Sequence, residues 1–209
     1  GARENALSWK LRDSPLVPKL FVAPGNAGTS RYAENVQISP TDLDQLLEFV
    51  EKNEIEFTVV GPEAPLAEGV VDLFQSRGHI IFGPDKNASR IESSKVFSKA
   101  IMLANGIPTG KAKWFSAYED ALQYISSITS PIVIKADGLA SGKGVVIAES
   151  VDAAEDILRK IMVDGSLGSA GDRILVEEFL EGKEVSVFAF VDGEYVSPMI
   201  AACDYKRLC

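Results

Sequence analysis

The sequence contains few of the residues that several common kinds of functional site require. It has one histidine and two cysteines among 209 residues. His79 alone excludes a histidine-rich metal site and argues against a Ser–His catalytic triad. Cys203 and Cys209 are too few for a disulfide scaffold, which predicts a reducing, cytoplasmic setting.

Long apolar runs and an excess of basic residues are also lacking. No apolar stretch approaches the roughly 20 residues of a membrane span, and no signal peptide is recognisable. The chain has 21 Lys and Arg against 30 Asp and Glu, a formal net charge of −9. Because nucleic-acid-binding surfaces are basic, we expect neither nucleic acid nor a membrane as a partner. A hydrophobic content of 46% fits a globular chain with one large or two small domains.

The most informative stretch that is present is 131–148, two β-branched runs joined by a glycine-rich loop. Ile132–Ile134 and Val145–Ile147 predict short buried strands. Glycines let main-chain amides approach an anion, and lysines supply charge for phosphate oxygens. Between and beside the strands lie Gly138, Gly142, Gly144, Lys135 and Lys143. The stretch therefore predicts a hairpin that closes over a polyphosphate as a lid; the alternative is an ordinary flexible hairpin.

This loop is not a Walker A loop. Three residues rather than four separate Gly138 from Gly142, and Lys143 is followed by Gly144 rather than Ser or Thr. A Walker A loop also opens a helix, whereas Val145–Ile147 is typical of a strand.

Strands and helices alternate in the first part of the chain. Strands are predicted at Leu20–Val22, Phe57–Val60 and Ile80–Phe82, and a helix capped by Ser39 follows the first of them. This alternation predicts a doubly wound, mostly parallel sheet, in which ligands bind at the carboxyl ends of strands. The loops Pro24–Thr29, Gly61–Leu66 and Gly83-Pro84 lie there, although each can also be a plain βα turn. No strand precedes the helix around Ala6–Leu11, so we expect the first strand of the sheet to be missing.

A second unit is predicted from residue 93 onward. Helices are expected from Lys95, from a Ser116 cap to Ser127, and over Val151–Val163; strands are expected at Ile174–Val176 and Val185–Val191. Lys95 in a first helical turn is either a surface residue without a specific role or a residue that extends toward an anion. Main-chain groups at Glu178–Leu180 can read an adenine edge, and Glu184 can accept from ribose hydroxyls. The alternative is that these glutamates form a solvated turn.

Together these stretches resemble the ATP-grasp superfamily, and within it the glycinamide ribonucleotide synthetase (phosphoribosylamine–glycine ligase) family. The resemblance spans nearly the whole chain. Its matching segments are Ala23–Thr29, Gly61–Leu66, Phe82–Pro84, Ser94-Lys95, Gly106–Thr109, Lys135–Val145 and Glu177–Leu180.

The resemblance implies that ATP phosphorylates the glycine carboxylate and that 5-phosphoribosylamine then attacks the acyl phosphate, in purine biosynthesis. The ATP-binding residues that it implies are Lys95, Lys135, Gly138, Ser141, Gly142, Lys143, Gly144, Glu177, Glu178, Phe179, Leu180 and Glu184. The implied substrate-binding residues are Gly25, Asn26, Gly28, Thr29, Gly61, Pro62, Glu63 and Pro65. Asp204, Lys206 and Arg207 match a segment near the substrates and are the implied catalytic residues.

The resemblance also implies a domain division and an incomplete chain. Residues 1–92 would form a truncated Rossmann-like substrate domain. Residues 93–209 would form an incomplete ATP-grasp domain, with a lid over about 110–180. The magnesium ligands of the family lie beyond Cys209, so no metal ligand is assigned. We expect residues 1–209 alone to be inactive, and fusion of a longer parent to later purine-pathway enzymes is left open. The alternatives are another ATP-grasp carboxylate–amine ligase and a non-catalytic, truncated nucleotide-binding isoform.

Overall fold

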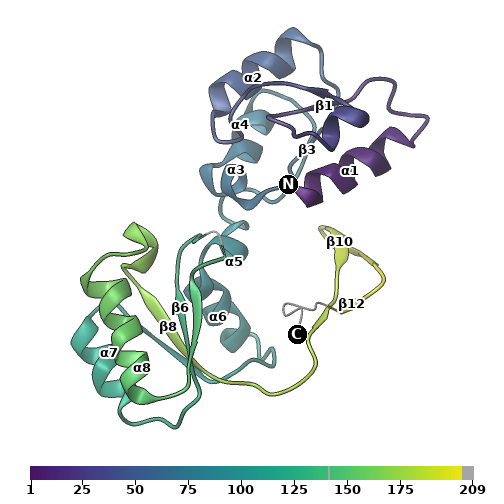
Figure 1. Cartoon of the computed structure of the whole chain (residues 1–209). Coiled ribbons are helices and arrows are strands. Elements are labelled where there is room, and N and C mark those ends of the chain that lie inside the picture. The colour runs from purple at the N-terminus through teal and green to yellow at the C-terminus, as the bar shows by residue number, and fades with distance from the viewer. Residues whose placement is uncertain (141, 204–209) are drawn as a thin grey trace. The chain divides into compact units, whose positions relative to one another are not determined.

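The computed structural model describes residues 1–140 and 142–203, and these fall into two compact units. The first unit is Gly1–Glu178 and the second begins at Phe179. Figure 1 shows the mixed helices and strands of both units.

The first part of the first unit alternates strands and helices, as predicted. Its elements are α1 (Ala2–Arg12), β1 (Phe21–Val22), η1 (Thr29–Arg31), β2 (Glu34–Asn35), α2 (Leu43–Lys52), β3 (Thr58–Val59), α3 (Glu63–Glu68), α4 (Val70–Ser76) and β4 (Ile81–Phe82). β1 pairs in parallel with β2, and β3 pairs in parallel with β4. Apolar side chains of α2 and α4 form the core with β4, and these are Leu47, Val50, Val70, Val71, Phe74 and Ile81. The predicted parallel sheet is therefore present as two parallel pairs.

The second part of this unit is built on a four-stranded antiparallel sheet in the order β5-β8-β6-β7. Its elements are α5 (Arg90–Ser93), α6 (Lys95–Ala104), β5 (Ala112–Phe115), α7 (Tyr118–Ile125), β6 (Ile132–Ala136), β7 (Val145–Ala148), α8 (Val151–Leu158), η2 (Arg159–Val163), η3 (Gly168–Gly171) and β8 (Ile174–Glu178). The predicted hairpin of two strands around the glycine loop is confirmed, with Lys135 opposite Val145.

The two faces of this sheet have different chemistry. Because side chains alternate along a strand, Ile132, Ile134, Ile174 and Val176 share one face, and all are buried in one apolar cluster with residues of α7 and α8. Figure 1 shows α7 and α8 side by side over this sheet. Lys135 and Glu177 lie on the opposite face, where α6 contacts β8.

Several predicted helix boundaries differ from those of the structure. Asp42, not Ser39, caps α2, because its carboxylate accepts from the main-chain N–H of Gln45. The residue before α7 is Ala117, and no side chain caps that helix, so Ser116 is not its cap. The short helix α3 begins at Glu63, so only the first two residues of the predicted 61–66 loop precede a helix.

Burial along α6 does not follow the apolarity of its residues. Leu103 near its end is 52% exposed, whereas Lys99, a charged residue, is 3% exposed. Lys99 is buried because polar and charged groups surround its ammonium, as described below.

The second unit contributes short strands. They are β9 (Val185–Ser186), β10 (Ala189–Asp192), β11 (Tyr195–Pro198) and β12 (Ala202–Cys203). β10 and β11 form an antiparallel hairpin, and β9 pairs with β12. The single strand predicted over Val185–Val191 is thus divided into β9 and β10.

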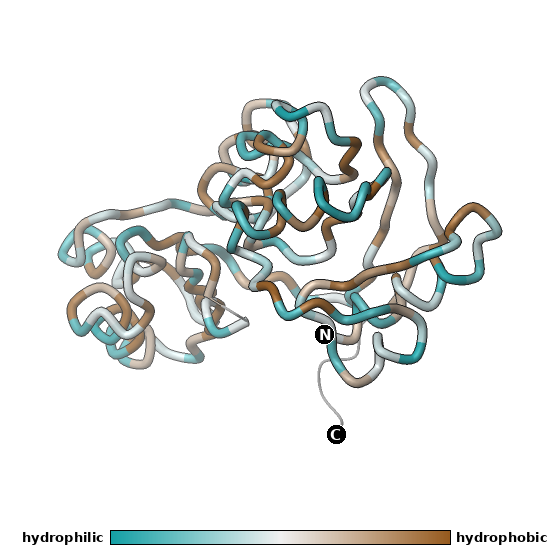
Figure 2. Tube along the Cα trace, turned by 90° about the horizontal axis from the view of Figure 1, so that it is seen from above, coloured by the Kyte–Doolittle hydropathy of each residue, from teal (hydrophilic) through white to brown (hydrophobic). Residues whose placement is uncertain are grey.

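Hydrophobic residues are distributed in short segments. Figure 2 shows brown and teal stretches alternating along the trace. Among the residues that the structure describes, no helix has the length and apolar character needed to cross a bilayer.

Candidate functional site

The glycine loop between β6 and β7 is held closely against the chain before β8. The N–H of Gly138 donates to the carbonyl oxygen of Ala170, at 3.3 Å. A Cβ at position 138 would lie 2.9 Å from the Cα of Ala170, a main-chain atom that cannot rotate away. Gly142 has a φ of +81°, which side-chain-bearing residues rarely adopt. Two of the three predicted glycines are thus explained by close approach and by backbone conformation.

Asp137, at the start of this loop, joins three elements. Its Oδ1 accepts from the Ser94 hydroxyl at 2.9 Å and from the Val96 N–H at 2.7 Å, both at the N-terminus of α6. Its Oδ2 accepts from the Arg173 Nε at 2.8 Å. Burial by itself raises the pKa of Asp137, but these hydrogen bonds outweigh it and hold the pKa below its ordinary value. The glycine loop is therefore bonded to the start of α6.

Lys95 lies at the junction of this loop and α6. Its main-chain N–H donates to the carbonyl oxygen of Asp137 at 3.2 Å, and its ammonium donates to the carbonyl oxygen of Gly138 at 3.2 Å. Partial burial lowers the pKa of Lys95, although the charges of Asp137 and Glu92 act in the opposite direction. The ammonium lies at the base of the loop, where a phosphate held by the loop amides would meet it.

A second ammonium is held nearby by a buried carboxylate. Glu177 on β8 forms ion pairs with Lys135 on β6 and with Lys99 on α6. Lys99 also donates to the Thr109 hydroxyl at 2.6 Å and to the Gly110 carbonyl oxygen at 3.1 Å. Burial raises the pKa of Glu177, but the hydrogen bonds and charges of its two lysines together lower it below the ordinary value.

The two lysines differ in access to solvent. The Lys135 side chain is 29% exposed, whereas that of Lys99 is 4% exposed. The ammonium of Lys135 is therefore accessible to a ligand, whereas the ammonium of Lys99 contacts Glu177 from inside the protein.

The predicted adenine and ribose segment is divided between the two units. Glu178 ends β8, where its N–H donates to the carbonyl oxygen of Lys111 at 3.0 Å and its Oε1 accepts from the Lys111 N–H at 2.8 Å. The N–H of Glu178 is thus bonded within the protein and does not read an adenine edge in this structure. Phe179, Leu180 and Glu184 belong to the second unit, and their predicted contacts with adenine and ribose stay predictions.

The predicted substrate loop after β1 is ordered by its own side chains. Asn26 Oδ1 accepts from the N–H of Gly28 at 2.8 Å and of Thr29 at 3.2 Å. The fully buried Thr29 donates its hydroxyl to the carbonyl oxygen of Asn26 and also bonds Asn35 on β2. Asn26 Nδ2 donates to the Gly1 carbonyl oxygen at 3.2 Å, so this loop, with Gly25, lies against the start of α1.

The predicted substrate segment after β3 also meets the start of α1. Arg3 donates to the carbonyl oxygen of Gly61 at 3.0 Å and forms an ion pair with Glu63 at 2.6 Å. The hydrogen bond and charge of Glu63 raise the pKa of Arg3, and the same bond lowers the pKa of Glu63. Pro62 precedes α3 and Pro65 is buried within it. The structure thus brings both predicted substrate segments to the first turn of α1.

Other predicted residues can be placed only in part. Lys143 is exposed in the glycine loop, and Gly144 is buried beside Ala140. Ser141, Asp204, Lys206 and Arg207 lie outside the described residues, so the predicted catalytic segment is not described.

Three residues of the observed network were not predicted: Asp137, Lys99 and Arg173. Asp137 belongs to the Lys135–Val145 segment that carried the resemblance, but nothing in its sequence showed that it binds a helix N-terminus. Lys99 follows Lys95 by four residues, the spacing of one helix face, which could have indicated a second inward lysine. Arg173 carries no comparable signal, because it meets Asp137 only through the tertiary fold.

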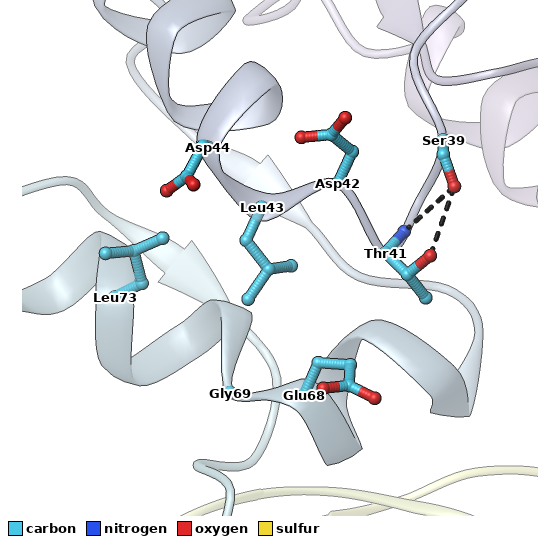
Figure 3. Close-up of a pocket in the computed structure, with 8 residues that line it drawn as sticks. All are labelled: Ser39, Thr41, Asp42, Leu43, Asp44, Glu68, Gly69 and Leu73. Carbon is cyan, nitrogen blue, oxygen red and sulfur yellow. Dashed lines mark hydrogen bonds between the residues drawn. The ribbon is translucent and has the colours of Figure 1, made fainter.

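A different depression, open and acidic, lies at the start of α2 and the junction of α3 with α4. It has a volume of about 690 Å³, and Asp42, Asp44 and Glu68 line it (Figure 3). The Asp42 carboxylate is already used as the α2 cap. None of the predicted site residues lines this depression, and we assign it no ligand.

The described residues do not offer a metal site. In residues 1–140 and 142–203, no group of three or more His, Cys, Asp and Glu side chains is placed to hold an ion. We therefore assign no metal ligand within these ranges.

Two family models together match the whole chain. The model described as "Phosphoribosylglycinamide synthetase, N domain" matches residues 1–92. The model described as "Phosphoribosylglycinamide synthetase, ATP-grasp (A) domain" matches residues 93–209.

Individual proteins give the same result. The chain is 50% identical to a phosphoribosylamine–glycine ligase of Pseudomonas putida and 48% identical to one of Pasteurella multocida, each over 210 residues. These alignments cover 100% of the chain but only 48% and 49% of the two relatives, so the chain spans about half the length of the curated relatives it matches. A crystal structure of phosphoribosylamine–glycine ligase from Thermotoga maritima matches with a TM-score of 0.81 and 31% identity, covering 100% of this chain and 49% of that one.

Proposed function

The chain belongs to the phosphoribosylglycinamide synthetase family, and from this premise we propose that it is part of an ATP-dependent ligase that joins glycine to 5-phosphoribosylamine. Within that ligase, residues 93–178 supply groups that bind the ATP phosphates. The first turn of α1 and the two loops bonded to it, after β1 and after β3, bind the phosphoribosylamine.

One observation carries the ATP part of this proposal. Two ammonium groups lie beside a glycine loop, that of Lys95 bonded to the carbonyl oxygen of Gly138 and that of Lys135 paired with the buried Glu177 carboxylate. The carboxylates of Glu177 and of Asp137, which bonds the loop to α6, keep their charge because hydrogen bonds lower their pKa. Fixed positive groups of this kind stabilise the charge that develops when a phosphoryl group is transferred, without reorganising during the reaction.

The proposed reaction needs no covalent intermediate on the protein. A glycine carboxylate oxygen attacks the γ-phosphorus of ATP, and ADP leaves. The neutral amine of phosphoribosylamine then attacks the carbonyl carbon of glycyl phosphate; phosphate leaves and the nitrogen loses one proton. The chain's residues orient the reactants and neutralise phosphate charge, which is how positioning and electrostatics accelerate such steps. Three further contacts are part of this proposal: Glu184 on the ribose, Phe179 and Leu180 on the adenine, and Asp204, Lys206 and Arg207 beside the substrates.

Family membership also supports proposals for the cofactors, the substrates and the cellular location. ATP with a divalent cation fits an ATP-grasp ligase, and we propose Mg²⁺ as that cation, which would supply positive charge against the phosphates when bound. The described residues hold no ligand set for such a cation, so no step is assigned to it. Small-molecule substrates fit the family, and a cytoplasmic location is our proposal.

The test uses a longer protein that contains these 209 residues. ADP release should require both glycine and phosphoribosylamine, and D-alanine or bicarbonate should not replace glycine. Lys95→Met should lower kcat/KM for ATP by about 100-fold, the usual effect of losing one fixed charge-stabilising group. The exposed Lys160 on η2 offers a matched control, and Lys160→Met should leave the rate unchanged.

The two alternatives give different results in this assay. Another ATP-grasp carboxylate–amine ligase would release ADP with a different acid–amine pair. A non-catalytic isoform would release none in any form of the chain. The 209-residue chain alone is expected to be inactive, and glycine-dependent turnover by it would contradict that expectation.

A further inference from the structure

The Glu177 carboxylate on β8 carries one negative charge but meets two ammonium groups. Its Oε1 pairs with Lys99 on α6, and its Oε2 pairs with Lys135 on β6. Burial raises the pKa of Glu177, but the hydrogen bonds and charges of both lysines outweigh burial and lower it, so the carboxylate is ionised at neutral pH. The three side chains together therefore carry two positive charges and one negative charge, a net charge of +1.

The ammonium of Lys99 has no donor left for a ligand. An ammonium has three N–H donors. Those of Lys99 meet Glu177, the Thr109 hydroxyl at 2.6 Å and the Gly110 carbonyl oxygen at 3.1 Å. The Lys99 side chain is also 4% exposed. Lys99 can therefore act on a ligand only through Glu177.

The ammonium of Lys135 differs in both respects. Its side chain is 29% exposed, and within residues 1–140 and 142–203 its ammonium meets no acceptor other than Glu177. Lys135 also lies on the strand that leads directly into the glycine loop. Two of its three N–H donors are thus available to phosphate oxygens held by that loop.

The number of cations beside Glu177 decides which net charge a phosphate meets. If Lys135 alone were paired with Glu177, the pair would be neutral, and the carboxylate would repel a phosphate about as strongly as the ammonium attracts it. Lys99 supplies a second positive charge from inside the protein. Because charges interact strongly in a partly buried site, where the effective dielectric constant is low, this excess of positive charge favours phosphate binding.

We propose that Lys99 is a positioning residue for ATP: it offsets the charge of Glu177, so that the exposed ammonium of Lys135 acts on the phosphates as an uncompensated positive charge. Lys99 itself touches no part of the nucleotide. This inference deepens the proposed function and rests on it, because it takes the phosphates of ATP as the groups that meet Lys135.

The experiment compares ATP with adenosine, which has the same base and sugar but no phosphate. Equilibrium dialysis measures both dissociation constants for a longer protein that contains these 209 residues. The quantity compared between variants is the dissociation constant of adenosine divided by that of ATP, because contacts with the base and the sugar cancel in this ratio. Lys99→Met leaves a neutral Lys135–Glu177 pair and should lower the ratio at least about tenfold.

Two variants at Glu177 separate an effect of charge from an effect of structure. Glu177→Gln removes the negative charge and leaves Lys135 in place, so the ratio should stay at or above that of the unchanged protein. Lys99→Met combined with Glu177→Gln restores the net charge of +1, and the ratio should return to within about threefold of its original value. If Lys99 only held the fold together, each change would disturb Lys135, and all three variants would lower the ratio.

Two further variants are matched controls. Thr109→Val removes one hydrogen bond of Lys99 but no charge, and Lys160→Met removes an exposed lysine of η2. Both should leave the ratio unchanged. Circular dichroism establishes that each variant is folded; if the variants that lack Lys99 are not, Glu177→Gln alone decides, because a purely structural role predicts a lowered ratio there.

Several results would overturn the proposal. They are an unchanged ratio in Lys99→Met, and a lowered ratio in Glu177→Gln or in the double variant. A longer protein that binds no ATP would overturn the proposed function and this inference together. If ATP binds with the expected pattern but glycine and phosphoribosylamine cause no ADP release, this inference is supported and only the proposed ligase reaction is overturned.

Discussion

Replacing Lys99 by Met tests whether the buried ion network holds the second part of the first unit together. Lys99 is 3% exposed and its ammonium bonds Glu177, the Thr109 hydroxyl and the Gly110 carbonyl oxygen. Met has a similar apolar length, so the substitution removes the charge and its bonds without leaving a large cavity.

The expected cost follows from what each partner loses. Removing one member of a buried ion pair costs about 3–5 kcal/mol. Glu177 keeps Lys135, which reduces this cost, whereas the Thr109 and Gly110 oxygens lose a donor at about 1 kcal/mol each. We therefore expect Lys99→Met to lower the free energy of unfolding by about 3 kcal/mol.

Tryptophan fluorescence during urea unfolding measures this change. Trp114 lies on β5, beside β8, and Trp9 is exposed on α1. A Trp9→Phe background therefore makes the signal specific to the sheet that contains Glu177. Lys160→Met in the same background is the matched control and should change the free energy by less than about 0.5 kcal/mol.

A double variant shows whether the loss comes from the pairing. If Lys99 and Glu177 interact as described, Lys99→Met combined with Glu177→Gln should cost less than the sum of the single changes, by at least about 1 kcal/mol. Equal effects of Lys99→Met and Lys160→Met, or full additivity in the double variant, would refute the reasoning.

The remaining predictions concern the glycine loop, acid pH and a helix cap. Gly138→Ala should destabilise the chain by about 1–3 kcal/mol in urea unfolding, because its Cβ meets the main chain of Ala170; an unchanged midpoint would contradict this contact. The pKa values of Asp137 and Glu177 are lowered in the folded state. As the pH falls, these carboxylates therefore take up protons in the unfolded chain before they do so in the folded chain. The stability that the two carboxylates contribute is complete above about pH 5 and is lost as the pH falls through the acid range. Unfolding measured from pH 7 to 3 should show this fall, and an Asp137→Asn, Glu177→Gln double variant should show a smaller one. Asp42→Ala should cost about 1 kcal/mol by loss of the α2 cap, whereas Ser39→Ala should cost less.

The sequence predicted those features that depend on local pattern. The two β-branched runs around the glycine loop identified the β6–β7 hairpin, because a period of two and a glycine turn are local signals. The alternation of strands and helices in residues 20–82 likewise predicted parallel pairing, and the order of motifs along the chain identified the family. Lys95 was correctly placed in the first turn of α6.

Features that depend on tertiary contacts were missed. Ser39 was predicted as the cap of α2, and only the folded loop decides that Asp42 bonds the helix amide. Lys99 was overlooked because a lysine on a helix is usually exposed; its burial requires Glu177, 78 positions later, to lie opposite it. Likewise, the N–H of Glu178 was expected to be open to adenine, whereas the chain at Lys111 accepts its hydrogen bond.

The alternation of the β6 and β8 side chains has a practical consequence for protein engineering. Even-numbered positions of both strands, such as 132 and 176, contribute to the hydrocarbon interior, whereas odd-numbered positions such as 133 and 175 share a face with the ionic residues. Substitutions at positions 132 and 176 therefore change the apolar cluster under α7 and α8, whereas substitutions at the buried positions 133 and 175 change the packing beside Lys135 and Glu177, so the two faces can be varied in separate libraries.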